Sequence, residues 1–279
     1  MRKIISTALF GSGDAYGQYL PALVLAHHSV FPDAEGWVLR VHVDRAVEGG
    51  RWGRFLRALA AKNLVEVEVM GDAPLCRAML WRLNPVFGPL NNYVFCRDAD
   101  SLPMPRDRAA CEQFISSHCV VHSVHDNVVH RGIMGGLCGF RAGLFQYQTG
   151  LRTLSDIYGL ADRAGVDWSM KGADQGVLAS LLLRSGSPEL FEHRFAGWSN
   201  GPRFLSERAP GSYDCPSQSA PVPDVGTSRL VPELTAQADR LAPHLGAAGF
   251  DHGAARRFYE EHGDVVITKH VNDCERSVS

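Results

Sequence analysis

Two aspartates, Asp98 and Asp100, flank one alanine just after the apolar run from Tyr93 to Cys96. Residues two apart in an extended chain point to the same side, so both carboxylates can reach one space beyond the end of a strand. Two negative charges at such a short distance repel each other. A Mg²⁺ or Mn²⁺ ion can bridge the two carboxylates and take further oxygen ligands from the phosphates of a substrate. The alternative is that one aspartate caps the next helix and the other is solvated.

Two further features are candidates for ligand contact. Asp174 and Gln175 stand in the first turn of the helix expected over residues 172–186, where an aspartate also complements the helix dipole without any chemical role. A glycine-rich segment upstream would let backbone approach a ligand closely, although turns and a bulged strand explain it as well. Its glycines are Gly132, Gly135, Gly136 and Gly139.

Neither histidine nor cysteine follows a zinc or disulfide pattern. A strand places only alternate residues on one side, so the four histidines of one segment lack a regular metal-ligand spacing. They are His118, His122, His125 and His130. The seven cysteines are odd in number and contain no Cys-x-x-Cys pair, which favours a reducing cytoplasm.

Length and charge exclude several classes of protein. A chain of 279 residues is long for one compact unit, so one elaborated domain or one domain with a subdomain is expected. The formal net charge is -2 and no basic block occurs, which argues against nucleic-acid binding. Arg2 and Lys3 before an apolar run resemble a signal peptide, but Gly11 and Asp14 interrupt that run. No run approaches the ~20 apolar residues of a transmembrane segment.

Strand and helix patterns alternate along the first half of the chain, which predicts an α/β fold with a mostly parallel central sheet flanked by helices. Strands are expected over 3–11, 37–44, 65–70 and 92–96, and helices over 16–31, 53–63, 74–84 and from 105. Ligands bind beyond the carboxyl ends of such strands, which is where the acidic pair lies. The glycines after the first strand have the wrong spacing for a dinucleotide fingerprint.

The second half is less regular. A strand is expected from His118, further helical pattern over 254–261, and a final strand over 264–271. The segment 198–229 is dense in Pro, Gly and Ser, which predicts a long irregular region or a lid.

At residues 93–140 the sequence resembles the core of a family of bacterial and viral glycosyltransferase-like proteins. The resemblance rests on an Arg-Asp-x-Asp-Ser element, an Asp-x-x-x-His element and a Gly-Gly pair, and it extends over roughly the first 185 residues. The matching positions are Arg97, Asp98, Asp100 and Ser101, then Asp126 and His130, then Gly135 and Gly136. Arg77 and Arg82 match the helix before the acidic motif, and Asp174 with Gln175 matches a later acidic element.

The resemblance implies a single glycosyltransferase-A-like domain over residues 1–279, with a nucleotide-binding half over 1–101 and an acceptor half over 102–279. It implies a nucleotide-sugar donor, a small-molecule or glycan acceptor and a Mn²⁺ or Mg²⁺ cofactor. The metal ligands would be Asp98, Asp100 and His270, with His252 and His262 as competitors for the last.

The other expected roles follow from the same resemblance. Arg77, Arg82 and Arg97 are candidate contacts to the donor, because guanidinium groups suit bidentate phosphate recognition. Each has a structural alternative, either solvation on a helix surface or an ion pair with Asp100. Asp174 would orient the sugar or act as base, and Gln175 would make a polar contact. The remaining expected roles are donor contact for Gly135 and Gly136 and acceptor contact for Asp126 and His130.

Two other functions remain open at this stage. A nucleotidyltransferase would share the sheet and the paired carboxylates, but it usually carries a basic residue in the loop after the first strand, which this chain lacks. A catalytically silent nucleotide-sugar-binding module on the same fold is the third possibility, because fold does not determine function.

Overall fold

The computed structural model describes residues 1–11, 14–17, 19–99, 103, 105–125, 133–184 and 190–194. The elements predicted over 198–229, 254–261 and 264–271 lie outside the described residues. So do four predicted site residues, Asp100, Asp126, His130 and His270.

One mixed sheet forms the centre of the described part of the chain, with the strand order β3-β2-β1-β4-β6-β5-β7. Every strand runs in the same direction except β6, which is antiparallel to both β4 and β5. The strands are β1 (Lys3–Leu9), β2 (Trp37–Val43), β3 (Glu66–Val69), β4 (Tyr93–Arg97), β5 (Val121–His125), β6 (Leu137–Arg141) and β7 (Leu190–Arg194). The predicted mostly parallel sheet is therefore confirmed, and so is the α/β class.

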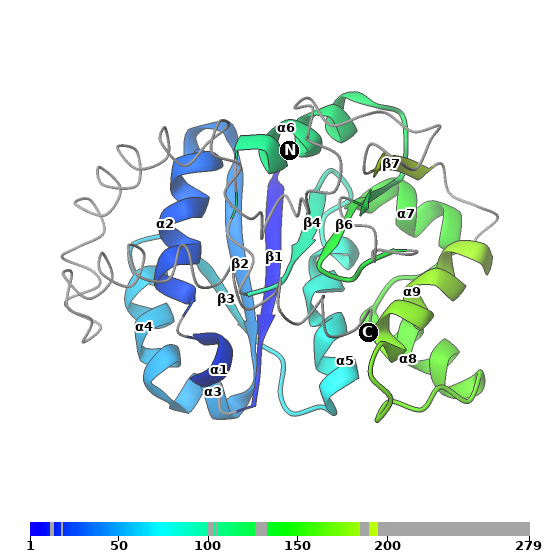
Figure 1. Ribbon diagram of the computed structural model, residues 1–279, viewed down its shortest axis with the longest axis horizontal. Coiled ribbons are helices and arrows are strands. Elements are labelled where there is room, and N and C mark those ends of the chain that lie inside the picture. Colours follow the sequence, from blue (N-terminus) through cyan, green and yellow to red (C-terminus); the bar gives the residue numbers. More distant parts are fainter. Residues whose placement is uncertain are drawn as a thin grey trace, which may run out of the picture.

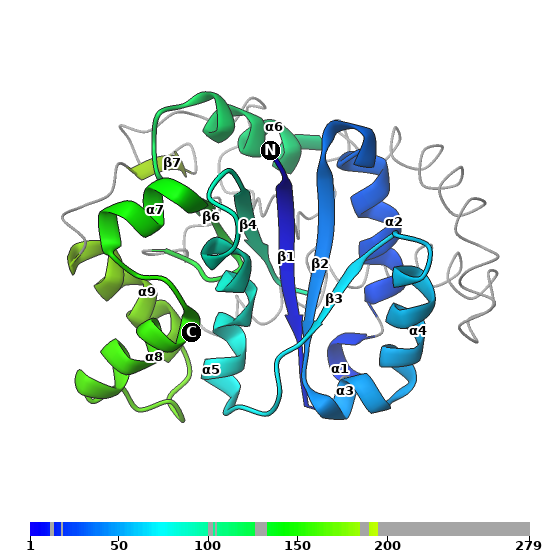
Figure 2. The same ribbon diagram turned by 180° about the vertical axis from the view of Figure 1, so that it is seen from behind.

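Helices cover both faces of this sheet (Figures 1 and 2). The α-helices are α1 (Asp14–Gly17), α2 (Leu20–Val30), α3 (Arg45–Gly49), α4 (Arg51–Ala60), α5 (Leu75–Met79), α6 (Pro105–Ser116), α7 (Ala142–Thr149), α8 (Leu154–Arg163) and α9 (Ala173–Arg184). Two 3₁₀ helices are η1 (Asp33–Glu35) and η2 (Leu80–Phe87). None of the helices in the described ranges is long and apolar enough to cross a membrane.

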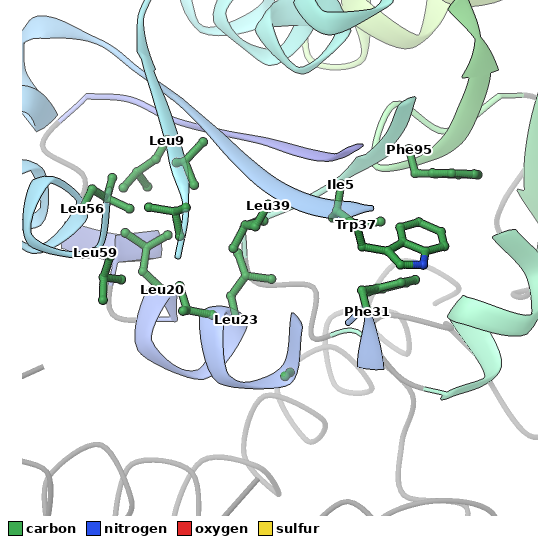
Figure 3. Close-up of a cluster of buried hydrophobic side chains, with 14 of the residues drawn as sticks. Ile5, Leu9, Leu20, Leu23, Phe31, Trp37, Leu39, Leu56, Leu59 and Phe95 are labelled. Atoms are coloured by element: carbon green, nitrogen blue, oxygen red, sulfur yellow. The ribbon is translucent and has the colours of Figure 1, made fainter. Parts of the chain in front are cut away.

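The core consists of two apolar clusters, one on each face of the sheet. The first packs α2, α4 and α6 against β1, β2 and β4, and the second packs η2, α7, α8 and α9 against β4, β5 and β6. In the first cluster the rings of Phe31, Trp37 and Phe95 lie side by side (Figure 3), with centroids 4.5 Å and 5.7 Å apart. These aromatic contacts join the end of α2 to the start of β2 and to β4.

Strand β4 contributes to both clusters because its side chains alternate between the faces. Tyr93 and Phe95 belong to the first cluster, whereas Val94 and Cys96 belong to the second. The same alternation places Arg97 on the α6 face and the next residue, Asp98, on the η2 face. The direction in which each site residue points is thus fixed by its place in this short strand.

Two predicted helices differ in detail from those observed. The helix expected over 16–31 is divided, with α2 starting only at Leu20 and a proline in its first turn. The helix expected over 74–84 continues from α5 as η2 and contains Pro85. Proline lacks an N–H and clashes with the carbonyl four residues earlier, which accounts for the tighter 3₁₀ winding there.

Candidate active site

Asp98 follows the last residue of β4 at the carboxyl end of the parallel strands. The register between β4 and β6 pairs Arg97 with Leu137, so Asp98 lies across from Gly136. A Cβ at Gly136 would lie only 2.1 Å from Oδ2 of Asp98. Only glycine therefore leaves room for the carboxylate, whose side chain remains 39% exposed.

Arg82 joins Asp98 to a second carboxylate. This arginine lies on η2 with a buried side chain, forms an ion pair with Asp98, and has Nη2 3.7 Å from Oδ2 of Asp174. Its Nε donates to the carbonyl oxygen of Met79 at 2.8 Å, which fixes the plane of the guanidinium. Burial lowers the pKa of Arg82, but the nearby carboxylate charges outweigh that effect and leave the pKa raised. The guanidinium therefore stays charged between two acids.

Asp174 is the more deeply buried of the two acids. It stands in the first turn of α9, and a Cβ at Gly135 would lie 3.0 Å from its Oδ2 and 3.2 Å from Nη2 of Arg82. Burial raises the pKa of Asp174 above its ordinary 3.8, and the charge of Arg82 offsets part of that rise. The carboxylate is consequently more basic than a solvated aspartate.

The structure thus brings together five residues that the sequence singled out, from four separate parts of the chain. They are Arg82, Asp98, Gly135, Gly136 and Asp174. The two acids and one guanidinium carry a formal charge of -1, which suits a site that receives a cation together with an anionic ligand.

As a metal ligand, Asp98 offers hard carboxylate oxygens on a partly exposed side chain. Mg²⁺ and Mn²⁺ need only one or two protein carboxylates when phosphates supply the rest. Within the described residues Asp98 belongs to no cluster of three metal-ligating side chains. Asp98 fits such an ion as one ligand of a set whose other predicted members, Asp100 and His270, lie outside the described residues.

Arg97 does not face this site, which corrects its predicted donor contact. The side chain is fully buried and forms a bidentate ion pair with Asp107 of α6, at 2.6 Å and 3.1 Å. It also donates to the carbonyl oxygens of Cys96 and Cys138. The alternation of β4 explains the difference, because residue 97 points to the face opposite Asp98. The partner is Asp107 and not Asp100, so Arg97 anchors α6 to the strand.

Arg77 also makes its contacts outside the group formed by Arg82, Asp98 and Asp174. Its Nη2 lies 2.5 Å and 2.7 Å from the two carboxylate oxygens of Asp162, and its guanidinium packs over the rings of Tyr158 and Trp168. Arg77 lies on α5 and Arg82 on η2, and the two side chains form ion pairs with different acids. The predicted donor contact of Arg77 is therefore corrected to a tether between α5 and α8.

A polar row that the sequence analysis missed lies across β1, β2 and β3. Oγ of Ser6 is 3.0 Å from Nε2 of His42, whose Nδ1 is 3.4 Å from Oε2 of Glu68. The order resembles a nucleophile, base and acid, but Ser6 and His42 are fully buried. Burial, with a smaller effect from Arg40, lowers the pKa of His42 to about 3. A nucleophile without solvent access and a base this weak do not support hydrolysis.

Comparison with known proteins identifies similar structures only. No family model and no curated protein matches the sequence. Residues 1–349 of S. aureus TarS are 13% identical, with 69% of this chain and 58% of that chain covered and a TM-score of 0.46. The galactosyltransferase LgtC, in complex with donor and acceptor sugar analogs, is 11% identical, with 69% and 73% covered and a TM-score of 0.45.

A third similar structure is the mannosyltransferase PcManGT from Pyrobaculum calidifontis in complex with GDP-Man and Mn²⁺. It is 10% identical, with 100% of this chain and 81% of that chain covered and a TM-score of 0.43. The chain spans little more than half of the TarS structure that it resembles. These likenesses concern the fold alone.

Proposed function

We propose that this chain is a metal-dependent glycosyltransferase that moves a sugar from a nucleotide-sugar donor to a small-molecule or glycan acceptor. The observation that carries the proposal is the group formed by Asp98, Arg82 and Asp174 beside Gly135 and Gly136. This group lies at the carboxyl edge of a mostly parallel sheet, where ligands of such folds bind. The resemblance of the motifs to a glycosyltransferase-A-like family supports the same assignment.

Asp98 is the proposed link between the chain and the donor diphosphate. Asp98, with Asp100 and His270 as further proposed ligands, would hold a Mn²⁺ or Mg²⁺ ion, which would supply positive charge to the leaving diphosphate. Arg82 holds the carboxylate of Asp98 in place through an ion pair and adds a fixed buried charge nearby. Gly135 and Gly136 are proposed contacts to the donor, and their lack of side chains leaves room for the side chains of Asp98, Arg82 and Asp174.

Asp174 is the proposed catalytic carboxylate. Its raised pKa makes it a better proton acceptor than a solvated aspartate, which suits either a base or a group that orients sugar hydroxyls. Gln175, the next residue, is proposed as a polar contact to the sugar. Asp126 and His130 complete the proposal as acceptor-side residues.

The proposed organisation is one domain over residues 1–279, with the donor half over 1–101 and the acceptor half over 102–279. A cytoplasmic location, expected from the cysteine content, belongs to the same proposal.

Incubation of the full chain with a panel of nucleotide sugars and Mn²⁺ or Mg²⁺ tests the proposal. Release of nucleoside diphosphate only when both metal and acceptor are present supports glycosyl transfer. Formation of nucleoside triphosphate and sugar 1-phosphate, only when pyrophosphate is added, would instead indicate a nucleotidyltransferase running in reverse. Donor binding without any turnover would indicate a silent binding module.

A further inference from the structure

A second group of metal-ligating side chains lies far from Asp98 in the fold. His27 and His28 stand in the last turn of α2, and Asp33 begins η1, which leads into β2 at Trp37. One ligand atom from each of the three lies within 4.8 Å of the others. Because β2 and β4 run in the same direction, this group lies at the amino edge of the sheet, whereas Asp98 lies at the carboxyl edge.

The contacts of His28 define its tautomer. Its Nε2 lies 2.8 Å from the carbonyl oxygen of Leu64, which can only accept a hydrogen bond, so Nε2 carries the proton. Nδ1 then faces Oδ1 of Asp33 at 3.1 Å. Oδ1 of Asp33 can face Nδ1 as the N–H of a charged ring, or it can share a bound metal ion with the Nδ1 lone pair of the neutral ring. A backbone carbonyl that holds the outer N–H is also the usual support of a histidine that binds a metal.

His27 supplies an independent observation. The side chain is completely buried, and neither Nδ1 nor Nε2 has a hydrogen-bond partner. A buried polar group without a partner is uncommon in folded proteins and points to a ligand or a functional role.

We propose that His27, His28 and Asp33 bind a divalent transition metal with Zn²⁺-like preferences. Two imidazoles and one carboxylate are ligands that Zn²⁺ favours, and they differ from the oxygen ligands expected around Asp98. Asp33 is 46% exposed, which gives the ion a way in and leaves a fourth position for water. Tetrahedral Zn²⁺ holds its ligand atoms about 3.4 Å apart, which is close to the 3.1 Å between His28 and Asp33, so only small shifts of the side chains are needed on binding.

The position of this site implies a structural role and not a part in sugar transfer. The ion would fasten the last turn of α2 to the segment that enters β2, next to the packed rings of Phe31 and Trp37 (Figure 3). Metal that binds only the folded chain raises its stability by mass action. The inference stands independently of the proposed glycosyl transfer.

Metal binding to the full chain, freed of metal with a chelator, tests the proposal. Co²⁺ serves as a spectroscopic probe of the site, and Zn²⁺ is added in parallel thermal unfolding. We expect one Co²⁺ with a tetrahedral absorption spectrum and a rise in Tm with Zn²⁺. Asp33→Asn and His28→Gln should weaken binding by more than ~10-fold, the scale of even second-layer changes around a metal, and abolish the rise in Tm.

Asp98→Asn is the control, because it alters the other proposed metal site and should leave the Co²⁺ spectrum unchanged. Asp33 is partly exposed, so Asp33→Asn should keep its metal-free Tm within a few degrees of the parent and remains informative if His28→Gln does not fold. The proposal is overturned if the parent takes up no Co²⁺, or if Asp33→Asn has the same Co²⁺ spectrum and affinity as the parent. It is also overturned if Asp98→Asn loses the Co²⁺ spectrum and the Co²⁺ affinity.

Discussion

The carboxylate of Asp98 occupies the space that any side chain at position 136 would need. A Cβ at Gly136 would meet Oδ2 of Asp98 at 2.1 Å, well inside van der Waals contact. The glycine that precedes β6 and the aspartate that follows β4 are thus placed against each other by the antiparallel register of the two strands. The position of Asp98, the proposed metal ligand, thus depends on Gly136, which has no functional side chain.

Gly136→Ala should therefore displace Asp98 and weaken donor binding by at least ~10-fold, with a loss of stability of about 1–3 kcal/mol from overpacking. Calorimetric donor titration and Tm on the same preparation measure both effects. Gly49→Ala is the matched control, since a Cβ there meets nothing within 4 Å. Equal donor affinity in the two variants would show that Asp98 does not need this space.

Arg97 should matter for stability and not for donor contact. Its ion pair with Asp107 is fully buried, so Arg97→Met alone leaves an unpaired buried carboxylate and should cost about 3–5 kcal/mol. The double variant Arg97→Met with Asp107→Leu removes both charges and should recover much of that loss. Urea unfolding of the parent, of Arg97→Met, of Asp107→Leu and of the double variant gives the coupling free energy between the two side chains. Additive losses, with no recovery in the double variant, would contradict this role.

Asp174→Asn should separate structure from catalysis. Burial already raises the pKa of this carboxyl, so a neutral amide of the same shape should leave Tm almost unchanged. Turnover should fall by at least ~10²-fold if Asp174 accepts a proton or orients the sugar. An Asn variant with near-normal turnover would remove Asp174 from the chemistry.

The activity of the parent enzyme should depend on pH through the same group. A base must be ionised, so kcat/KM should decline as pH falls through the folded pKa of Asp174, which lies above 3.8. A pH profile at fixed metal concentration measures the midpoint. A midpoint at or below 3.8 would contradict the raised pKa.

His42 should make the fold sensitive to acid. Its pKa is lowered from 6.5 to about 3, so between these values the unfolded chain binds a proton that the folded chain does not. Stability from this group is fully present above pH 6.5 and is lost as pH falls toward 3, by about 2 kcal/mol between pH 7 and pH 5. Urea unfolding at both pH values should show a smaller difference for His42→Gln than for the parent. Equal differences would show that His42 is not the group responsible.

The sequence was most informative where one short element decided the geometry. The apolar run of β4 predicted both the strand and the site of Asp98 at its end, and helix α9, which begins at Ala173, was expected with Asp174 in its first turn. The alternation in β4 also contained the information that Arg97 points away from Asp98, and the motif resemblance obscured it.

Other features depend on contacts that no local pattern contains. Helix α8 was missed although Thr153 and Asp156 form a capping box, which is a visible signal of a helix start. Strand β7 has no regular alternation, and its pairing with β5 spans about seventy residues of chain. The contact of Arg82 with both acids depends on the 3₁₀ winding of η2, which sequence periodicity predicted as a regular helix.

The most direct test of the central claim is diphosphate release from a nucleotide sugar by the parent and by Asp98→Asn, each with Mn²⁺ and with excess chelator. Asp72→Asn, a change to an exposed aspartate, is the matched control. The account predicts release by the parent and the control that stops on chelation, and a loss of at least ~10²-fold in Asp98→Asn at a temperature well below the Tm of each protein. Release that continues at the same rate in chelator, or in Asp98→Asn with Mn²⁺, would contradict it.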